Sequence, residues 1–519
     1  MKLSELVSAL PCRCTCPPEG IEITAVSTHT AYIPQGALFL CIPGEHYDPA
    51  AHLQEIASAG AAAVVLEEGR QPPIDRCGIP IVYVPSCRAA LPFLLNRFYG
   101  EPTEGMLLIA VTGTNGKTST ASMIAACLSA AGIRTALIGT ADCREYGGRS
   151  YLPSPESPYG EKVRTMTTPD PEFLYPTLAA MRTDGIDAVV MEASSHALAL
   201  DKLAPLHFRV AVFTGLSPEH LDYHKTMQNY LAAKSKLFSQ CDIGVVNADS
   251  VYTKPLLADA RCRVLRCTCS SSRARSDIGA ARIRCDSPDG ISYEYRGKYL
   301  RMNIRVGIPG RFTVTNSLLA ITAAMAAGVF PDICCEALER MPAVRGRMER
   351  IASDADFSIL IDYAHTPEAL RNLLQTARGF LAEGGRLLVL FGCGGDRDPA
   401  KRAPMGQIAA KYADAAVITS DNSRTEDPDS IIETILSGIP SDFPHRVIPD
   451  RRDAIAFILT AARKNDIVLL VGKGHETYEI DAAGMHPFSE REIVATALEK
   501  IKNGETVYED QDGQTPFLF

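Results

Sequence analysis

Three features that would assign a chain to a common protein class are missing from this sequence of 519 residues. No apolar run approaches the roughly 20 residues that cross a membrane, and the N-terminus lacks the apolar stretch and cleavage site of a signal peptide. Positive charge does not predominate, because 52 Lys and Arg face 61 Asp and Glu, for a net charge of −9. These absences argue against membrane insertion and against a broad nucleic-acid-binding face. We expect a cytoplasmic protein.

The residues that are present describe an ordinary globular chain. Hydrophobic residues make up 46% and charged residues 22%, and at about 100–200 residues per domain the length predicts three or four domains. The 16 cysteines lie mostly in apolar contexts, which favours reduced packing residues over disulfides in the cytosol. Cys12, Cys14 and Cys16 form a cluster flanked by prolines, and such a cluster could bind a metal ion. We do not favour a metal site there, because the sequence has no second cluster that could supply further ligands.

The order of apolar runs and turn-rich stretches predicts three domains, over residues 1–104, 105–340 and 341–519. The first mixes short strands with an Ala-rich helix, with a strand over 37–44 and a helix followed by a strand over 52–68. In the other two, apolar runs alternate with helical segments, which predicts parallel sheets covered on both faces and an α/β fold. A stretch rich in Cys, Ser and Arg, 261–286, predicts surface β-structure before the next helix.

A glycine loop between a strand and a helix is the strongest local motif. It reads Gly113-Thr114-Asn115-Gly116-Lys117-Thr118. Backbone N–H groups and the positive helix end can cradle phosphates there, with Lys117 on the outer phosphates and Thr118 on Mg²⁺. The loop departs from the usual pattern, because Val111 stands where the first glycine is expected.

Polar groups at strand ends extend this candidate site. Glu192 ends an apolar strand, where its carboxylate could ligate Mg²⁺, and His220, Asp222 and His224 cluster in EHLDYH. Four apolar runs in the last third also end in polar residues and glycine, and ligands of open α/β sheets bind beyond such ends. Spacing alone gives Lys234 no special weight.

The motifs, taken in order, carry a family resemblance. They are GTNGKT, TTPDP, MEASSHAL, EHLDYH, AAKSKLF, GRFTVTN, GRMER, DYAHTP, GCGGDRD, DNSR and GKGHE. From about residue 22 to 497 the chain resembles the Mur ligases, and among them the MurE type. The resemblance implies a UDP-binding N-terminal domain, a central P-loop-type ATPase domain with a parallel sheet, and a Rossmann-like C-terminal domain. It also implies ATP-driven amide formation through an acyl phosphate.

The resemblance assigns a role to each matching residue. It implies catalysis by Lys117, Glu192, His220 and Lys234, with Mg²⁺ held by Thr118 and Glu192 and a second Mg²⁺ by His220 and a carbamylated Lys234 (N6-carboxylysine). ATP would be bound by Gly113, Thr114, Asn115, Gly116, Lys117, Thr118, Ser119, Asn316, Arg347 and Asp362. UDP-MurNAc-L-Ala-D-Glu would be bound by Thr30, Thr167, Thr168, Ser194 and Lys202. The incoming amino acid would be bound by Arg397, Asp421, Asn422, Ser423, Arg424, Gly472 and Glu476. His365 would lie near the nucleotide.

The identity of that amino acid depends mainly on Arg424. A guanidinium can bind the second carboxylate of meso-diaminopimelate, which L-lysine lacks, in two parallel hydrogen bonds. Ser423 replaces the proline usual before this arginine, which loosens the turn that aims it. L-lysine or another diamino acid is the nearest alternative.

The nucleotide-sugar site departs further from the family pattern. His29-Thr30-Ala31 stands where the family has D-S-R, and Lys202 stands where an arginine is common. More remote alternatives are a folylpolyglutamate synthetase and a non-catalytic muropeptide-binding sensor. We expect a monomer.

Overall fold

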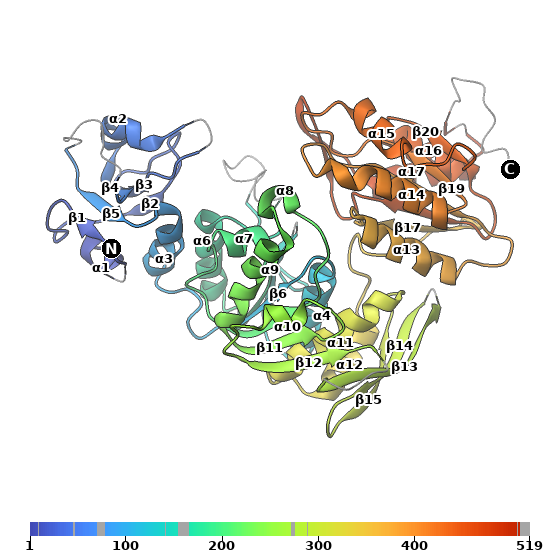
Figure 1. Cartoon of the computed structure of the whole chain (residues 1–519), viewed down its shortest axis with the longest axis horizontal. Coiled ribbons are helices and arrows are strands. Elements are labelled where there is room, and N and C mark those ends of the chain that lie inside the picture. The colour runs from blue at the N-terminus through green and yellow to red at the C-terminus, as the bar shows by residue number, and fades with distance from the viewer. Residues whose placement is uncertain are drawn as a thin grey trace.

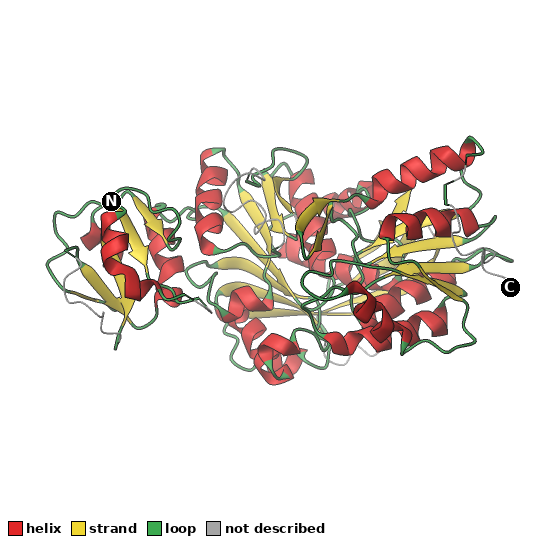
Figure 2. Cartoon of the chain, turned by 90° about the horizontal axis from the view of Figure 1, so that it is seen from above, coloured by secondary structure: helices red, strands yellow, loops and turns green. Residues whose placement is uncertain are grey.

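The computed structural model is an α/β protein whose three main sheets follow one another along the chain (Figures 1 and 2). The predicted fold class is therefore confirmed. The residues described by the structure are 1–8, 10–44, 47–69, 78–140, 142–153, 166–270, 276–287, 289–505 and 507–508. None of the helices among these residues is long and apolar enough to cross a membrane. We keep 104/105 and 340/341 as proposed domain boundaries.

The N-terminal sheet has five strands in the order β1-β5-β4-β3-β2, all parallel except β1. The strand predicted over 37–44 is β3 and ends at Leu40, and the helix and strand predicted over 52–68 are α2 and β4. Helix α3 packs on α6 of the central part, which joins the two (Figure 1). The bounds are α1 Leu3–Val7, β1 Arg13–Cys14, β2 Ala25–Ser27, β3 Ala37–Leu40, α2 Leu53–Ser58, β4 Ala61–Glu67, β5 Ile81–Val84, α3 Cys87–Phe98 and α6 Pro171–Thr183.

The central sheet has ten strands in the order β15-β14-β13-β12-β11-β10-β6-β9-β7-β8. Its middle is parallel as predicted, but antiparallel strands extend both edges. The surface β-structure predicted over 261–286 is β12 and β13, with 271–275 outside the described residues. The bounds are β6 Leu107–Thr112, β7 Thr135–Gly139, β8 Asp142–Glu145, β9 Ala188–Glu192, β10 Phe208–Phe213, β11 Cys241–Asn247, β12 Arg263–Thr268, β13 Ile278–Ser287, β14 Gly290–Arg296 and β15 Arg301–Val306.

Two layers of helices cover the central sheet. Helices α4, α11 and α12 bury one face, and α4 and α11 are rich in small apolar residues because both lie deep in that layer. The other face packs against α6 and the short helices that follow β9 and β10. The bounds are α4 Lys117–Ala130, α7 Ser195–Ala199, α8 Leu221–His224, α9 Met227–Ser235, α10 Thr253–Leu256, α11 Arg311–Ala326 and α12 Pro331–Arg340.

The C-terminal sheet has six strands in the order β16-β17-β21-β18-β19-β20, and only β16 is antiparallel. Helices α13, α14 and α15 cover one face, and α16 and α17 the other. The carboxyl ends of β17, β18, β19 and β21 therefore meet at one edge. The bounds are β16 Glu349–Ile351, β17 Ser358–Asp362, α13 Pro367–Gly379, β18 Leu387–Phe391, α14 Arg402–Tyr412, β19 Ala415–Ile418, α15 Pro428–Leu436, β20 His445–Val447, α16 Arg451–Ala461, β21 Ile467–Val471, β22 Tyr478–Asp481, β23 Gly484–Pro487 and α17 Glu490–Lys502.

Candidate active site

The glycine loop connects β6 to α4, and two of its positions require glycine. Gly113 has φ 151°, and a Cβ there would collide with the Thr214 hydroxyl. Gly116 caps α4 in the left-handed region at φ 83°, and a Cβ there would come 2.5 Å from Oδ1 of Asn316. The predicted adenine contact Asn316 on α11 therefore lies directly against the loop.

Two lysines share one carbonyl oxygen of this loop. Nζ of Lys117 donates to the carbonyls of Gly113 (3.1 Å) and Thr114 (2.8 Å), and Nζ of Lys234 donates to the same Gly113 carbonyl at 2.9 Å. Lys234 is 1% exposed. Burial, with the neighbouring charge of Lys117, holds the pKa of Lys234 well below its usual range. The structure thus brings Lys234 into the site, although its spacing carried no such signal.

A hydroxyl and a carboxylate lie beside the loop in a geometry that suits Mg²⁺. Glu192, 1% exposed at the end of β9, accepts hydrogen bonds from the Thr118 hydroxyl (3.0 Å) and the Thr140 N–H (3.0 Å). These are hard oxygen donors, and Mg²⁺ at phosphate sites usually takes only one or two protein ligands beside phosphate oxygens. The residues present fit the metal that the sequence predicts. Arg347 donates to the same Thr118 hydroxyl at 3.0 Å, and so connects the C-terminal part to the loop.

A group of histidine and tyrosine rings surrounds His220, which has a left-handed backbone at φ 56°. Its ring lies 4.9 Å from that of His196 and 6.3 Å from that of Tyr230. Burial and nearby positive charges lower the pKa of His220 to about 4 despite the opposing charge of Glu219. His220 is therefore neutral near pH 7 and has a lone pair free for a metal.

Glu219 is a site residue that the sequence interpretation missed. Oε1 of Glu219 lies 3.0 Å from Nε2 of His365, which joins the central and C-terminal parts. Burial acts to raise the pKa of Glu219, but the hydrogen bond and charge of His365 and the charge of Lys117 hold it below its usual range. Its place in EHLDYH, directly before His220, was the signal that could have identified it.

Asp362 ends β17 and binds backbone groups on two sides. Its carboxylate accepts hydrogen bonds from the N–H of Met348 and the N–H of Ala364, both at 2.7 Å, and burial raises its pKa. The same turn positions the Tyr363 ring, over which the Arg347 guanidinium lies at 4.8 Å. The predicted nucleotide residues Arg347, Asp362 and His365 therefore come together at one end of β17.

Most residues predicted to bind the peptide substrate cluster at the end of β9. The Thr168 hydroxyl lies 3.2 Å from the Ser194 hydroxyl, and the Thr167 hydroxyl lies 3.1 Å from that of Thr140. Lys202 pairs with Asp170 at 2.6 Å. Thr30, by contrast, is exposed in the N-terminal part, and the described residues provide no hydrogen bond between it and this cluster.

Two guanidinium groups flank the Gly394 turn after β18. A Cβ on Gly394 would come 3.0 Å from Nη1 of Arg424 and 3.9 Å from Cγ of Arg397. Each group makes only carbonyl contacts among the described residues, with Arg424 donating to Gly395 at 2.8 Å and Arg397 to Asp396 at 3.3 Å. Among the residues that the structure describes, no ion pair joins either guanidinium to a carboxylate, although the charges of Asp222 and Asp396 act on Arg397.

The turn that carries Arg424 is held without the proline usual in the family. Ser423 is 7% exposed, and its carbonyl accepts a hydrogen bond from the N–H of Glu426 at 3.1 Å. The N–H of Arg424, at φ 54°, donates to the carbonyl of Ile480 at 3.1 Å. These hydrogen bonds restrain the turn that aims Arg424. The sequence had predicted a looser turn, because Ser423 replaces the proline ring.

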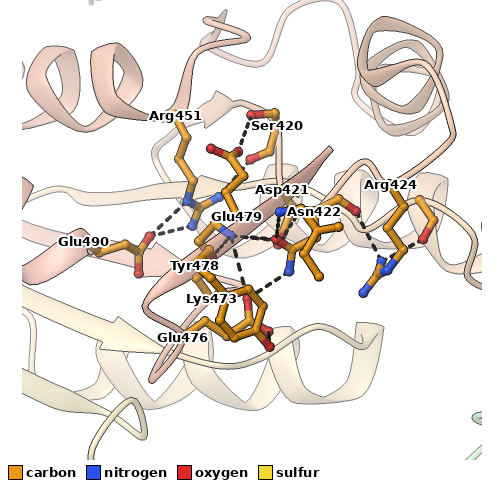
Figure 3. A network of polar contacts seen from close by, with 12 residues as sticks. Ser420, Asp421, Asn422, Arg424, Arg451, Lys473, Glu476, Tyr478, Glu479 and Glu490 are labelled. Atoms are coloured by element: carbon orange, nitrogen blue, oxygen red, sulfur yellow. Dashed lines mark hydrogen bonds and ion pairs between the residues drawn. The ribbon is translucent and has the colours of Figure 1, made fainter. Parts of the chain in front are cut away.

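The carboxylates of Asp421 and Glu476 belong to the same network of polar contacts as Arg424 (Figure 3). Glu476 accepts a hydrogen bond from the side-chain amide of Asn422 at 2.9 Å. Gly472, at φ 117°, lies so close to Asp421 that a Cβ there would come 2.6 Å from its carboxylate. The site thus brings guanidinium groups and carboxylates close together, which matches the charges of a zwitterionic amino acid.

Cys12, Cys14 and Cys16 lie close to one another in the N-terminal part. Within the described ranges no group of three or more His, Cys, Asp or Glu side chains is arranged to hold a metal ion. No disulfide joins any of the cysteines that the structure describes.

Comparison with known proteins identifies the family. Residues 111–324 match the Mur ligase middle domain, and residues 346–474 match the Mur ligase glutamate ligase domain. The chain belongs to the Mur ligase family. It is a MurE-type, ATP-dependent amide ligase of peptidoglycan synthesis.

Similar proteins cover the whole chain. It is 37% identical over 513 residues to a UDP-N-acetylmuramoyl-L-alanyl-D-glutamate–2,6-diaminopimelate ligase of Syntrophomonas wolfei, covering 97% of this chain and 100% of that one. The ligase of the same name from Bacillus cereus is 36% identical over 514 residues, with the same coverage. A solved structure of a ligase with this name superposes with a TM-score of 0.64 at 28% identity, covering 92% of this chain and 95% of that one.

Proposed function

We propose that this enzyme joins a diamino acid, meso-diaminopimelate, to the D-glutamate of UDP-MurNAc-L-Ala-D-Glu with hydrolysis of ATP to ADP. The observation that carries the proposal is the pocket charge. Among the described residues Arg397 and Arg424 form no ion pair with a carboxylate, and Asp421 and Glu476 lie in the same part of the site. The names of the relatives support the same substrates. We place the reaction in the cytoplasm and treat the enzyme as a monomer.

The first step needs cations, because the γ-phosphate of ATP and the substrate carboxylate are both anions. Lys117 supplies one from the glycine loop, and Arg347 another at the Thr118 hydroxyl. Mg²⁺ at Thr118 and Glu192 would neutralise phosphate charge when bound. Attack of the carboxylate oxygen on the γ-phosphorus forms the acyl phosphate and releases ADP. The amine then attacks the acyl carbon, and phosphate leaves.

Carbamylation of Lys234 gives this lysine a role beside cations. A buried amine that shares the Gly113 carbonyl with Lys117 is poorly placed to carry a positive charge. Addition of CO₂ to the neutral amine, with loss of a proton, converts it into an anion. That anion and the neutral His220 would hold the second Mg²⁺.

Residues Thr167, Thr168, Ser194 and Lys202 would hold the peptide substrate near this centre, and Thr30 its nucleotide end. The first four lie at or beside the carboxyl end of β9, where Glu192 also lies. Thr28, two residues before Thr30, donates a 2.5 Å hydrogen bond to Glu172 of the central part, which brings the N-terminal part toward the same substrate.

Phosphate release with ATP, Mg²⁺ and UDP-MurNAc-L-Ala-D-Glu tests the proposal, comparing meso-diaminopimelate with L-lysine. We expect a strong preference for diaminopimelate that Arg424→Ala abolishes. Arg371→Ala, on an exposed part of α13, is the control and keeps the preference. A preference for L-lysine would show that the enzyme adds L-lysine and not diaminopimelate. No turnover with either amino acid would favour a non-catalytic muropeptide sensor.

A further inference from the structure

Lys473 of the GKGHE motif is a buried cation with no role in the chemistry described so far. Its side chain is 0% exposed. Gly472 and Gly474, at φ 117° and 56°, flank it and turn the chain sharply after β21. Substitution of Gly474 would bring a Cβ to within 2.7 Å of Tyr363, so the turn is tightly packed. A lysine buried in this way must be compensated by polar partners.

Those partners belong to the network of polar contacts that contains the proposed amino-acid-binding residues (Figure 3). Nζ of Lys473 donates to Oδ1 of Asn422 and to the carbonyl of Tyr478, both at 2.9 Å. It also lies 3.7 Å from Oε2 of Glu476 and 3.9 Å from Oδ1 of Asp421. The ammonium group therefore stands between the two pocket carboxylates, with direct hydrogen bonds to their neutral neighbours.

The hydrogen bond from Lys473 fixes the orientation of the Asn422 side-chain amide. Oδ1 accepts from Lys473 and from the N–H of Ile480 at 3.0 Å, so the NH₂ end is directed to Glu476 at 2.9 Å. A chain of hydrogen bonds thus runs from Lys473 through Asn422 to Glu476. Tyr478 contributes a second, longer contact of 3.5 Å to the other oxygen of Glu476.

We propose that Lys473 is a positioning residue of the amino-acid pocket. It stands between Asp421 and Glu476 and, through Asn422, sets the direction in which these carboxylates meet the ammonium groups of the incoming amino acid. This inference rests on the proposed function of the pocket. In this role Lys473 acts on the substrate through the two carboxylates and not by direct contact.

The charges around the pair agree with this role. Burial acts to raise the pKa of Asp421, but the charges of Lys473 and Arg451 hold it below its usual value. Burial and the nearby Asp421 raise the pKa of Glu476, and Lys473 opposes that rise. The other charged or titratable groups that face Glu476 are Arg424, Tyr478 and Tyr363.

Substitution of Lys473 in the full-length enzyme tests the proposal. We expect Lys473→Met to raise KM for the amino acid by about tenfold or more, since a buried charge partner is lost. KM for ATP and for the nucleotide substrate should stay within about twofold. The acid limb of kcat/KM against pH should move to higher pH, because two adjacent carboxylates then lack their shared cation.

Two further variants separate positioning from folding. Lys473→Arg keeps the positive charge but replaces the single ammonium nitrogen by a planar guanidinium. It should therefore raise KM for the amino acid while the acid limb of kcat/KM stays in place. This variant remains informative if Lys473→Met does not fold. Arg386→Met removes a mostly buried cation, paired with Asp466 at 2.6 Å, at the opposite end of the same sheet. It should lower stability without changing the amino-acid KM selectively.

The outcomes also distinguish this inference from the proposed function. An amino-acid KM within twofold of wild type in both Lys473 variants, with Arg424→Ala and Glu476→Gln raising it, would overturn the inference alone. Equal loss of kcat with all substrates and an unmoved acid limb would do the same, since it indicates a structural role. If Arg424→Ala and Glu476→Gln also leave the amino-acid KM unchanged, the assignment of the pocket itself is wrong.

Discussion

At the scale of single residues, the site depends on positions where only one side chain fits. Gly116 needs a left-handed backbone and lies against Asn316, and Lys234 needs a fully buried place beside the Gly113 carbonyl. Only the requirement for Gly116 can be recognised from neighbouring residues in the sequence. The contact of Gly116 with Asn316 and the burial of Lys234 depend on the packing of α11 and α9 against the loop.

Substitution of Gly116 tests the loop geometry. Gly116→Ala should raise KM for ATP by on the order of tenfold, because the left-handed backbone costs about 1 kcal/mol and the new Cβ meets Asn316. Gly132→Ala at the other end of α4 is the matched control. Its φ of 80° is similar, but no atom lies within 4 Å of the new Cβ. Equal ATP affinity in both variants would contradict the close contact with Asn316.

Carbamylation of Lys234 is directly measurable. With ¹³C-labelled bicarbonate, the wild-type enzyme should show a carbamate carbon signal by NMR, and Lys234→Ala should lose both this signal and activity. Lys236→Ala, two residues along the chain at an exposed pair with Asp201, should keep both. A carbamate signal that persists in Lys234→Ala would place the modification elsewhere.

At the scale of elements, a buried ion pair ties two helices to two strand ends beneath the amino-acid pocket. Arg451 of α16 bonds Glu490 of α17 at 2.7 Å, and both side chains are at most 1% exposed. The same guanidinium donates to the carbonyls of Ser420 after β19 (3.1 Å) and Val471 of β21 (2.9 Å). The pocket floor thus depends on helices that contribute no predicted binding residue.

Loss of this pair should be costly. Arg451→Met should lower the free energy of unfolding by about 3–5 kcal/mol, because Glu490 is left as a buried, unpaired carboxylate. Arg451→Met with Glu490→Leu should recover part of that loss. Urea unfolding measures both, with Lys502→Met as the control, since it removes only an exposed pair with Asp354. Little change in Arg451→Met would mean that water reaches Glu490.

The ring cluster of α7, α8 and α9 should make stability depend on pH. His224 is 5% exposed and lies 2.9 Å from the Ser195 hydroxyl; burial and then the charges of His196 and Lys234 lower its pKa to about 4. The unfolded chain therefore binds more protons between about pH 6.5 and 4, and stability should fall as pH falls through that window.

Urea unfolding of His224→Gln at several pH values measures this dependence. The variant should show a shallower fall in stability below pH 6.5 than the wild type. Ser195→Ala keeps the imidazole and removes only its hydroxyl partner, so it should retain the wild-type slope. An unchanged slope in His224→Gln would assign the acid sensitivity to other groups.

At the scale of the whole molecule, few contacts join the glycine loop to the C-terminal part. The hydrogen bonds Arg347–Thr118 and His365–Glu219 both cross from the turns around β17 to the phosphate-binding side of the central sheet. In the proposed reaction, ATP and the amino acid meet at this junction. The relative placement of the two parts is therefore part of the catalytic geometry.

Weakening this junction should loosen the molecule. Glu219→Gln removes the charge that faces His365, so we expect a larger radius of gyration by small-angle X-ray scattering without substrates, and a higher KM for ATP. Glu368→Gln, at the exposed start of α13, is the control and should change neither. An unchanged radius with an unchanged KM for ATP would show that the junction does not depend on this pair.

Sequence alone predicted the features that are written in consecutive residues. The strand, glycine loop and helix around Gly116 follow from backbone freedom and apolar period, and the parallel sheets follow from alternating runs. The motif order identified the family, and with it came proposed roles for residues such as Lys234 that spacing could not assign. Surface β-structure was predicted at β12 and β13, but the antiparallel pairing of β13 with β14 and β15, and of β8 with β7, was not, because edge pairing depends on tertiary neighbours.

Only the tertiary structure decided which distant groups share an atom. Lys234 reaches the Gly113 carbonyl, which Lys117 also contacts, across a separation of 121 residues, and His365 meets Glu219 across 146. Lys473 looks like any polar residue of a glycine-rich turn until its burial between two carboxylates is seen. The physical reason is that periodicity and backbone preference act over a few neighbouring residues. Desolvation and charge pairing act through space, and therefore depend on the completed fold.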